Sequence, residues 1–163
     1  MIFKVLILFF CGLIIYLLIN RPNYIRVQSS SGRIYYVNKM KNSFEAANLL
    51  DSIYDKYNDI VTKLEQTGTV SNKNVNRLRY RIKHLRLMEM PSNDSSLGFT
   101  LNKYEIVKIK LRFKNGSFRS MGDLDKVILH ELAHVMSTDY GHTKEFHKNL
   151  KILTDINEYN YGN

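Results

Sequence analysis

The sequence predicts an α+β fold, in which a small antiparallel or mixed sheet packs on helices behind an apolar N-terminal segment. Three observations support this prediction. Short stretches with a hydrophobic period of two predict strands, and longer stretches with apolar residues at three-to-four spacing predict helices. One of these helices carries the pattern His-Glu-x-x-His at residues 130–134. With 163 residues, the chain is long enough for one modest domain.

Residues 1–20 are predicted to form an uncleaved transmembrane anchor, and residues 21–163 to form the folded domain. The run 5–19 is uncharged and almost wholly apolar. Together with residues 1–3 it gives about eighteen apolar residues, at the short end of the roughly 17–25 that span a bilayer. Residues 18–22 offer no small-x-small cleavage site, so a cleaved signal peptide is the lesser alternative.

The charges around the apolar run predict its orientation. Arg21, Arg26 and Arg33 outweigh Lys4, which by the positive-inside rule places the following domain on the cytoplasmic side. The expected localisation is that of a single-pass membrane protein. The single cysteine, Cys11, lies within the apolar run, so the chain can form no intrachain disulfide.

A β-hairpin and a helix are expected to open the domain. Residues 24–38 consist of two strand-forming stretches around a Ser/Gly turn, which predicts the hairpin. The helix should begin at Asn42, with Glu45 three residues later as in a capping box. Its apolar residues recur at three-to-four spacing until Gly68 ends it.

A second helix is predicted over residues 71–90, where Pro91 stops it. Its outer face has a balance of +5 out of the chain's formal +9, because six basic residues stand against Glu89: Lys73, Arg77, Arg79, Arg81, Lys83 and Arg86. Such a face attracts nucleic acid or an anionic membrane surface, or is simply solvated. The sequence leaves these three interpretations open.

Two further strands are predicted at residues 99–101 and 105–113. The second has a clean period of two, in which Val107, Ile109, Leu111 and Phe113 alternate with Lys108, Lys110 and Arg112. One face of this strand should be buried and the other charged, which predicts an edge strand. Asn115 and Gly116 then mark a tight turn before the next helix.

That helix carries the strongest chemical signal in the chain. Residues four apart lie on one helix face, so His130 and His134 can direct two imidazoles at one point. Two neutral imidazoles are good Zn²⁺ ligands, and Glu131 can reach a metal-activated water as a general base. A solvated helix face is the bland alternative. It is disfavoured because the neighbouring residues are apolar, where unpartnered polar groups would be unfavourable.

A catalytic zinc site usually has three protein ligands, and His142 is the predicted third. Gly141 permits a sharp turn before it, and Thr143 is a suitable N-cap for a packing helix that follows to about residue 154. The residues 157–163 should be loose or lie over the site. Three rival ligands remain open: Asp139, His147 and Glu158.

The stretch from Leu129 to Phe146 resembles the WLM and SprT-like group of zincin metallopeptidases. In that group His-Glu-x-x-His is followed by a short loop, a third histidine, and a phenylalanine one turn into the next helix. A broader similarity over residues 30–150 is to uncharacterised WLM-like proteins of large DNA viruses and algae. It includes Ser-Ser-Gly-Arg-Ile-Tyr-Tyr-Val at 30–37 and Phe-Thr-Leu-Asn-Lys at 99–103.

The resemblance implies a zincin fold, with His130, His134 and His142 as zinc ligands and Glu131 as general base. One departure is that seven residues separate His134 from His142, more than is usual in the WLM type. Relatives of this group include proteases that act on proteins crosslinked to DNA. The apolar N-terminus, placed in a host-cell or virion membrane if the protein is viral, argues against a simple transfer of that role.

The predicted function is a zinc-dependent metallopeptidase that hydrolyses peptide bonds in protein or peptide substrates, with Glu131 as general base. The alternative is a non-catalytic, zinc-containing structural or binding protein of a membrane or virion. Glu131 argues against this alternative, since a purely structural zinc site has no use for that carboxylate. A third possibility is a nucleic-acid-associated protease that uses the basic helix. No pattern in the sequence specifies an oligomeric state.

Overall fold

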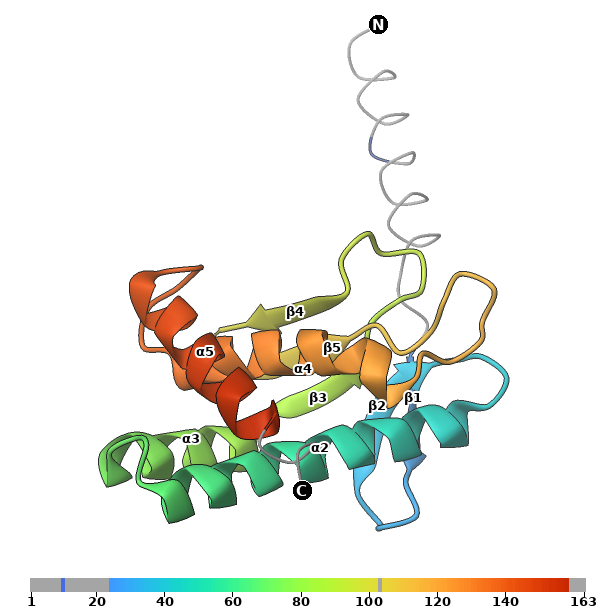
Figure 1. The fold of residues 1–163 in the computed structure, drawn as a ribbon. Coiled ribbons are helices and arrows are strands. Elements are labelled where there is room, and N and C mark those ends of the chain that lie inside the picture. Colours follow the sequence, from blue (N-terminus) through green and yellow to red (C-terminus); the bar gives the residue numbers. More distant parts are fainter. Residues whose placement is uncertain (1–9, 11–23, 103, 159–163) are drawn as a thin grey trace, which may run out of the picture.

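The structure, a computed structural model, describes residues 10, 24–102 and 104–158. The described residues form a mixed α+β fold, which confirms the predicted class (Figure 1). In chain order its elements are β1 (Tyr24–Gln28), β2 (Ile34–Asn38), α2 (Ser43–Thr67), α3 (Asn72–His84), β3 (Arg86–Glu89), β4 (Gly98–Leu101), β5 (Ile106–Ile109), α4 (Met121–Met136) and α5 (Lys144–Glu158).

The five strands make one mixed sheet in the order β1-β2-β3-β5-β4. Strands β2, β3 and β5 run parallel, while β1 and β4 pair antiparallel at the two edges. Residues paired across neighbouring strands point to the same face. Leu87, Val107 and Thr100 therefore share one face, and this is the face on which α2 and α4 pack.

The hydrophobic core lies between this face of the sheet and the helices. Helix α2 runs along the sheet and buries one apolar stripe, as its three-to-four spacing predicts (Figure 1). Tyr57 of α2 is fully buried, and its hydroxyl donates to the Ile128 carbonyl of α4 at 3.3 Å. A buried residue of α2 thus helps to fix the position of the helix that carries the His-Glu-x-x-His pattern.

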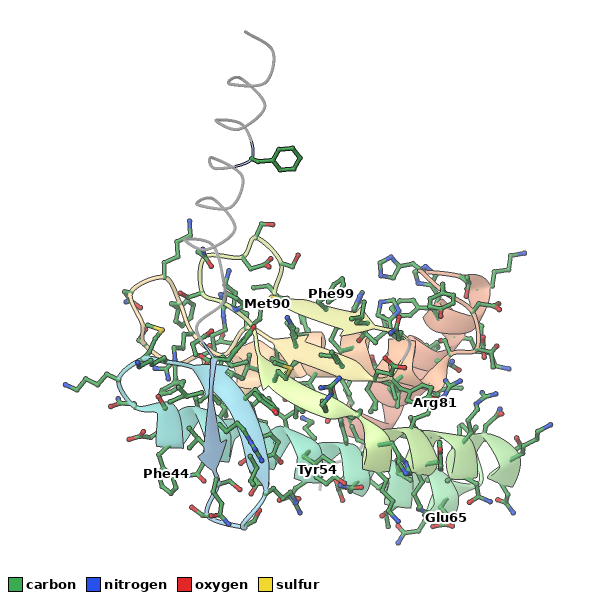
Figure 2. All side chains as sticks on the ribbon, turned by 180° about the vertical axis from the view of Figure 1, so that it is seen from behind. Phe44, Tyr54, Glu65, Arg81, Met90 and Phe99 are labelled. Carbon is green, nitrogen blue, oxygen red and sulfur yellow. The ribbon has the colours of Figure 1, made fainter. Side chains whose placement is uncertain are left out.

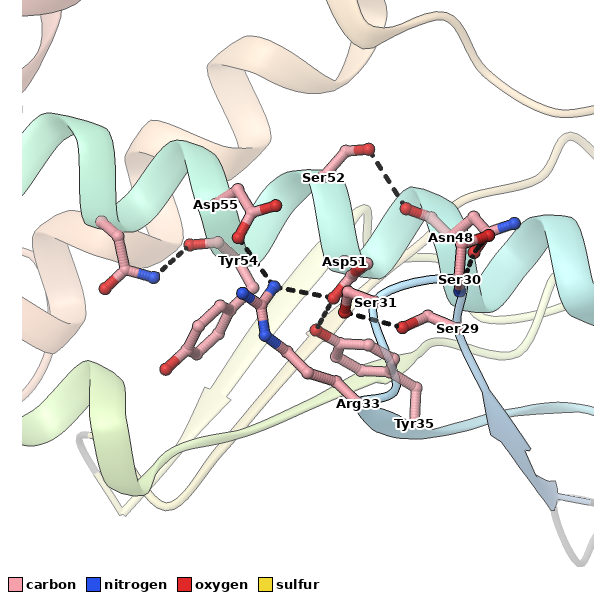
Figure 3. A network of polar contacts seen from close by, with 11 residues as sticks. Ser29, Ser30, Ser31, Arg33, Tyr35, Asn48, Asp51, Ser52, Tyr54 and Asp55 are labelled. Carbon is pink, nitrogen blue, oxygen red and sulfur yellow. Dashed lines mark hydrogen bonds and ion pairs between the residues drawn. The ribbon is translucent and has the colours of Figure 1, made fainter.

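Polar contacts fasten the β1–β2 hairpin to α2 (Figure 3). The Arg33 guanidinium donates to the carboxylates of Asp51 and Asp55, each at 2.7 Å. The Tyr35 hydroxyl donates to the same Asp51 oxygen at 2.9 Å. The backbone N–H of Ser30 donates to the Asn48 side chain at 2.8 Å. The hairpin predicted at residues 24–38 is confirmed.

The predicted strand at 105–113 is wrong in its end and its position. Strand β5 stops at Ile109 and lies between β3 and β4, so the edge strand on this side is β4. Arg112 is buried rather than solvated, because Nε donates to the Glu89 carboxylate at 2.8 Å. Its Nη2 also donates to the Asn42 carbonyl at 3.0 Å, which ties the start of α2 to the sheet.

Two predictions for the helices are also corrected. The second helix ends at His84 rather than Met90, because the following residues form the central strand β3. Asn42 has a left-handed backbone with φ of 63° and makes no side-chain cap, so the predicted capping box at α2 is wrong. A capping box instead starts α4, where Ser120 and Asp123 exchange hydrogen bonds.

The prediction of a single-pass membrane protein is wrong. No helix in the described part of the chain is long and apolar enough to cross a bilayer. The predicted anchor over residues 1–20 lies, apart from Phe10, outside the described residues. The boundary between residues 20 and 21 stays a prediction.

Candidate metal centre

Three histidine side chains converge at one point beside the C-terminal half of α4. His130 and His134 come from successive turns of α4, and His142 comes from the loop that follows. The Nε2 atoms of His130 and His142 are 3.1 Å apart. One ring nitrogen from each of the three residues lies within 4.8 Å of the other two. The structure thus brings together the three histidines that the sequence named, and their role as metal ligands stays a prediction.

Phe146 forms the apolar floor under the three imidazoles. Its ring centroid is 4.4 Å from that of His134, 4.7 Å from that of His142 and 4.9 Å from that of His130. The Phe146 side chain is almost fully buried, and it lies in the first turn of α5. Packing against one rigid ring limits the orientations that the imidazoles can adopt.

Two of the histidines, His130 and His134, are held in the neutral form that binds metals. Burial, together with the charges of His130 and His142, lowers the pKa of His134 to about 4. Burial and the charges of His142 and His147 also lower the pKa of His130. Neutral imidazole keeps a nitrogen lone pair for coordination, so no proton has to be displaced at neutral pH.

The donor set fits zinc. Two nitrogens on one tetrahedral Zn²⁺, each at about 2.0–2.1 Å, lie about 3.3 Å apart. The His130–His142 separation of 3.1 Å is close to this value, and the 4.8 Å bound on the group requires only small side-chain movements. Three imidazoles without a carboxylate also match a borderline-soft transition metal rather than calcium or magnesium.

Glu131 is buried next to the histidines and is held by a hydrogen bond from a strand. Its side chain is 4% exposed, and the Thr100 hydroxyl of β4 donates to Oε2 at 2.5 Å. Burial raises the pKa of Glu131 to about 7, although the hydrogen bond from Thr100 acts in the opposite direction. A carboxyl group with a pKa near neutrality can both accept and release a proton at neutral pH.

A cleft of about 320 Å³ opens over these groups. One wall is the edge strand β4, another is α4, and the third is the loop between α4 and α5. Its lining residues are Gly98, Phe99, Thr100, His130, Glu131, His134, Asp139, Tyr140, Gly141 and His142. The three histidines, the buried carboxylate and an exposed sheet edge thus share one concave site, the setting in which ligand-binding and active sites usually lie.

The sequence of the chain matches the WLM domain family over residues 41–161. The chain belongs to the WLM domain family. The uncharacterised protein R325 of Acanthamoeba polyphaga mimivirus is 30% identical over 140 residues, which are 80% of this chain and 71% of the mimivirus protein. This confirms the resemblance to WLM-like proteins of large DNA viruses, and it places the chain in a family of zinc-dependent metallopeptidases.

Two crystal structures of Wss1 from Saccharomyces cerevisiae, one of them of a mutant, are similar to the chain. The first covers 73% of this chain and 82% of its own, with 22% identity and a TM-score of 0.48. The mutant covers 78% of this chain and 92% of its own, with 21% identity and a TM-score of 0.49.

The loop that carries His142 in this WLM domain is fixed by Glu145 of α5. Oε2 of Glu145 accepts from the Thr138 N–H at 2.8 Å, the Thr138 hydroxyl at 2.6 Å and the Asp139 N–H at 3.2 Å. Gly141 then turns with φ of 77°, a left-handed conformation that favours glycine. The Thr143 hydroxyl accepts from the Phe146 N–H at 3.3 Å, which confirms Thr143 as the cap of α5.

Two arginines of the expected basic face bind the C-terminal end of α4, the helix that carries His130 and His134. Arg81 is buried, and Nη1 donates to the carbonyls of Val135 and Ser137, both at 2.6 Å, at the end of α4 (Figure 2). Arg77 donates to the Met136 carbonyl at 3.3 Å. These residues satisfy carbonyls that a helix end leaves unpaired. The basic surface that the sequence offered to nucleic acid or membrane is correspondingly smaller.

The rival ligands are not in the metal group of the described residues. Asp139 lines the cleft, but its carboxylate is not among the converging ligand atoms. The His147 ring centroid is 6.4 Å from that of His142, and the His147 side chain is exposed. Glu158 ends α5 and does not join the group. The assignment of His142 as third ligand stays a prediction, and its position beside His130 and His134 supports it.

Proposed function

We propose that this WLM domain is a zinc-dependent peptidase with a zincin-like catalytic site, which hydrolyses peptide bonds in protein substrates. The observation that supports the proposal most is the shared cleft, in which Glu131 is buried one residue from His130 and the three imidazoles converge. His130, His134 and His142 would hold the metal. When bound, Zn²⁺ would act as a Lewis acid that polarises the scissile carbonyl. It would also lower the pKa of water, so that water loses a proton more readily near neutral pH and becomes a better nucleophile.

Glu131 would move the protons of the reaction. Its Oε2 is engaged by the Thr100 hydroxyl, so Oε1 is the oxygen that would take a proton from the attacking water. The same carboxyl group would then deliver this proton to the departing amine. In the metal-free chain burial raises the pKa of Glu131 to about 7, so this carboxyl group has a higher affinity for a proton than a solvated glutamate has.

The edge strand β4 gives the substrate a place to lie. Gly98, Phe99 and Thr100 line the cleft, and among the described residues β4 pairs with β5 alone. An extended peptide can add to such an edge through main-chain hydrogen bonds, largely independent of its sequence. This supports an extended segment of a protein as the substrate class.

The alternative is a zinc-containing binding or structural protein with no activity. A structural zinc site is usually closed by four protein ligands, often cysteines. In the described residues the converging group has three histidines, and it faces a cleft. A buried Glu131 without a proton-transfer role would also be an unexplained loss of stability.

The test compares the full-length protein with Glu131→Gln. We expect one zinc per chain in both, and hydrolysis of casein or a peptide library by the wild type only. A chelator should abolish that hydrolysis, and added zinc should restore it once the chelator is removed. Turnover by Glu131→Gln at the wild-type rate would contradict the role of Glu131. A wild type that binds zinc without hydrolysing any substrate would favour the binding protein.

A further inference from the structure

Glu131 lies against two residues of β4, Gly98 and Thr100, which are two positions apart in that strand. Gly98 is paired with Ile109 and Thr100 with Val107, and both partners are completely buried on the helix-covered face of the sheet. Phe99 between them is 48% exposed and turns to the other face (Figure 2). The register of β4 on β5 therefore directs positions 98 and 100 at α4 together.

Gly98 leaves the space in which the carboxylate lies. A Cβ added at Gly98 would be 2.9 Å from Cδ of Glu131 and 2.8 Å from Cγ1 of Val127, and it would collide with Oε1 of Glu131. The backbone of Gly98 has no positive φ, so its requirement is for room rather than for a special conformation. Any larger residue must displace the Glu131 side chain or move the strand away from α4.

Thr100 fixes the orientation of the Glu131 carboxylate. Its hydroxyl donates to Oε2 at 2.5 Å, a length typical of a charge-assisted O–H···O⁻ bond. Glutamate has several rotatable bonds, and a misplacement of about 1 Å in a catalytic group can reduce a rate about 100-fold. A donor fixed on a strand can hold this side chain in one orientation, because the sheet limits the movement of the strand.

We propose that Gly98 and Thr100 are positioning residues for Glu131: the hydroxyl of one orients its carboxylate, and the missing side chain of the other makes room for it. The inference rests on the proposed function, since it concerns the base of that reaction. It adds a constraint that the zinc signature lacks, because the catalytic residue on α4 depends on a strand that is 31 positions earlier in the sequence.

Two substitutions at Thr100 separate this role from simple strand packing. Thr100→Val keeps the shape and the strand preference but removes the hydroxyl, while Thr100→Ser keeps the hydroxyl and weakens the strand preference. Positioning predicts a kcat about 10- to 100-fold lower in Thr100→Val, with KM and zinc content unchanged, and a near-normal kcat in Thr100→Ser. Packing predicts the opposite order of the two variants, and that order would overturn the proposal.

Gly98→Ala should lower kcat by about 100-fold while zinc is retained. Gly122→Ala is the matched control, because Gly122 is exposed in the first turn of α4 and its nearest neighbour is 3.8 Å from an added Cβ.

For the threonine series the control is Thr62→Val, an exposed position in α2 whose hydroxyl donates to the Asn58 carbonyl of the same helix at 3.0 Å. Melting curves identify any unfolded variant, and Thr100→Ala serves as a second variant without the hydroxyl.

A measurement without turnover decides the case independently. The carboxyl carbon resonance of Glu131 can be assigned by ¹³C NMR in the zinc-free chain with the help of Glu131→Gln. At one fixed pH we expect this resonance to move in Thr100→Val and Gly98→Ala, and to stay in Thr100→Ser and Thr62→Val. An unmoved resonance in Thr100→Val would overturn the proposal even in an active enzyme. An inactive wild type would refute the proposed function, and the resonance would still test the positioning.

Discussion

The Nε2 atoms of His142 and His130 lie 3.1 Å apart, although the two residues are 12 positions apart and belong to different elements. A Zn²⁺ ion coordinated by both nitrogens would hold them at about this distance. We therefore predict that His142→Ala loses most of its zinc, measured as zinc per chain after dialysis. His147→Ala is the control, since this exposed imidazole stands next to the group without joining it. Full zinc retention in His142→Ala would contradict the assignment of His142 as the third ligand.

Glu145 should control the affinity of the metal site without touching the metal. One of its oxygens accepts three hydrogen bonds from Thr138 and Asp139, and partial burial, which raises the pKa, is outweighed by these bonds, which lower it. Glu145→Gln weakens these charge-assisted bonds, so we expect the dissociation constant for zinc to rise about tenfold. Competition with a chromogenic chelator measures it. Glu158→Gln, at the far end of the same helix, should leave the constant unchanged.

Arg81 should stabilise the fold through its buried hydrogen bonds rather than through its positive charge. Its substitution by methionine leaves the carbonyls of Val135 and Ser137 without their buried donor. We expect the free energy of unfolding to fall by about 2–4 kcal/mol, measured in urea on the zinc-free protein. Lys83→Met removes the same charge from an exposed position of α3 and should change it by less than about 0.5 kcal/mol. Equal effects of the two variants would refute the capping role.

The hairpin network predicts how stability depends on acid. Partial burial raises the pKa of Asp51, but hydrogen bonds from Ser31, Tyr35 and Arg33 and the Arg33 charge together lower it below its usual value. A carboxyl whose pKa is lower in the folded state stabilises the fold above its unfolded pKa of about 3.9, and this contribution disappears as the pH falls through the folded value.

Asp51→Asn should therefore lower the melting temperature at pH 7, and the difference from wild type should shrink as the pH is reduced below about 5. Melting curves across this range measure the difference. Asp59→Asn, which breaks only an exposed i,i+4 pair with Lys63, is the control and should have a small effect. A difference that grows in acid would contradict a lowered pKa of Asp51 in the folded protein.

The part of the site on α4 was predictable because its geometry is local. A helix brings residues four apart to one face, so His130 and His134 required no knowledge of the fold. Gly141 and Thr143 gave local reasons for a turn and a new helix around His142. Thr100 left no such trace, since its contact with Glu131 spans 31 positions and depends on the pairing of β4 with β5.

The errors in the fold have a related cause. The segment 86–89 continues the composition of the helix before it, and only its place between two parallel strands makes it β3. Arg112 fits an exposed position by charge, yet it is buried because Glu89 and several backbone carbonyls pair with it. A pattern of polar and apolar residues cannot distinguish a solvated charge from a paired one.

The alternation along β4 makes the site sensitive to a slip of one residue. Successive side chains of a strand point to opposite faces, so a shift of β4 by one position on β5 would turn Gly98 and Thr100 away from α4. Phe99 would then meet the carboxylate of Glu131 with an apolar ring in place of a hydroxyl. An insertion in the segment 91–97 is thus harmless only when the extra residue stays in the loop. An insertion that shifts the strand would remove the contacts of Gly98 and Thr100 with Glu131 and leave all three histidines in place.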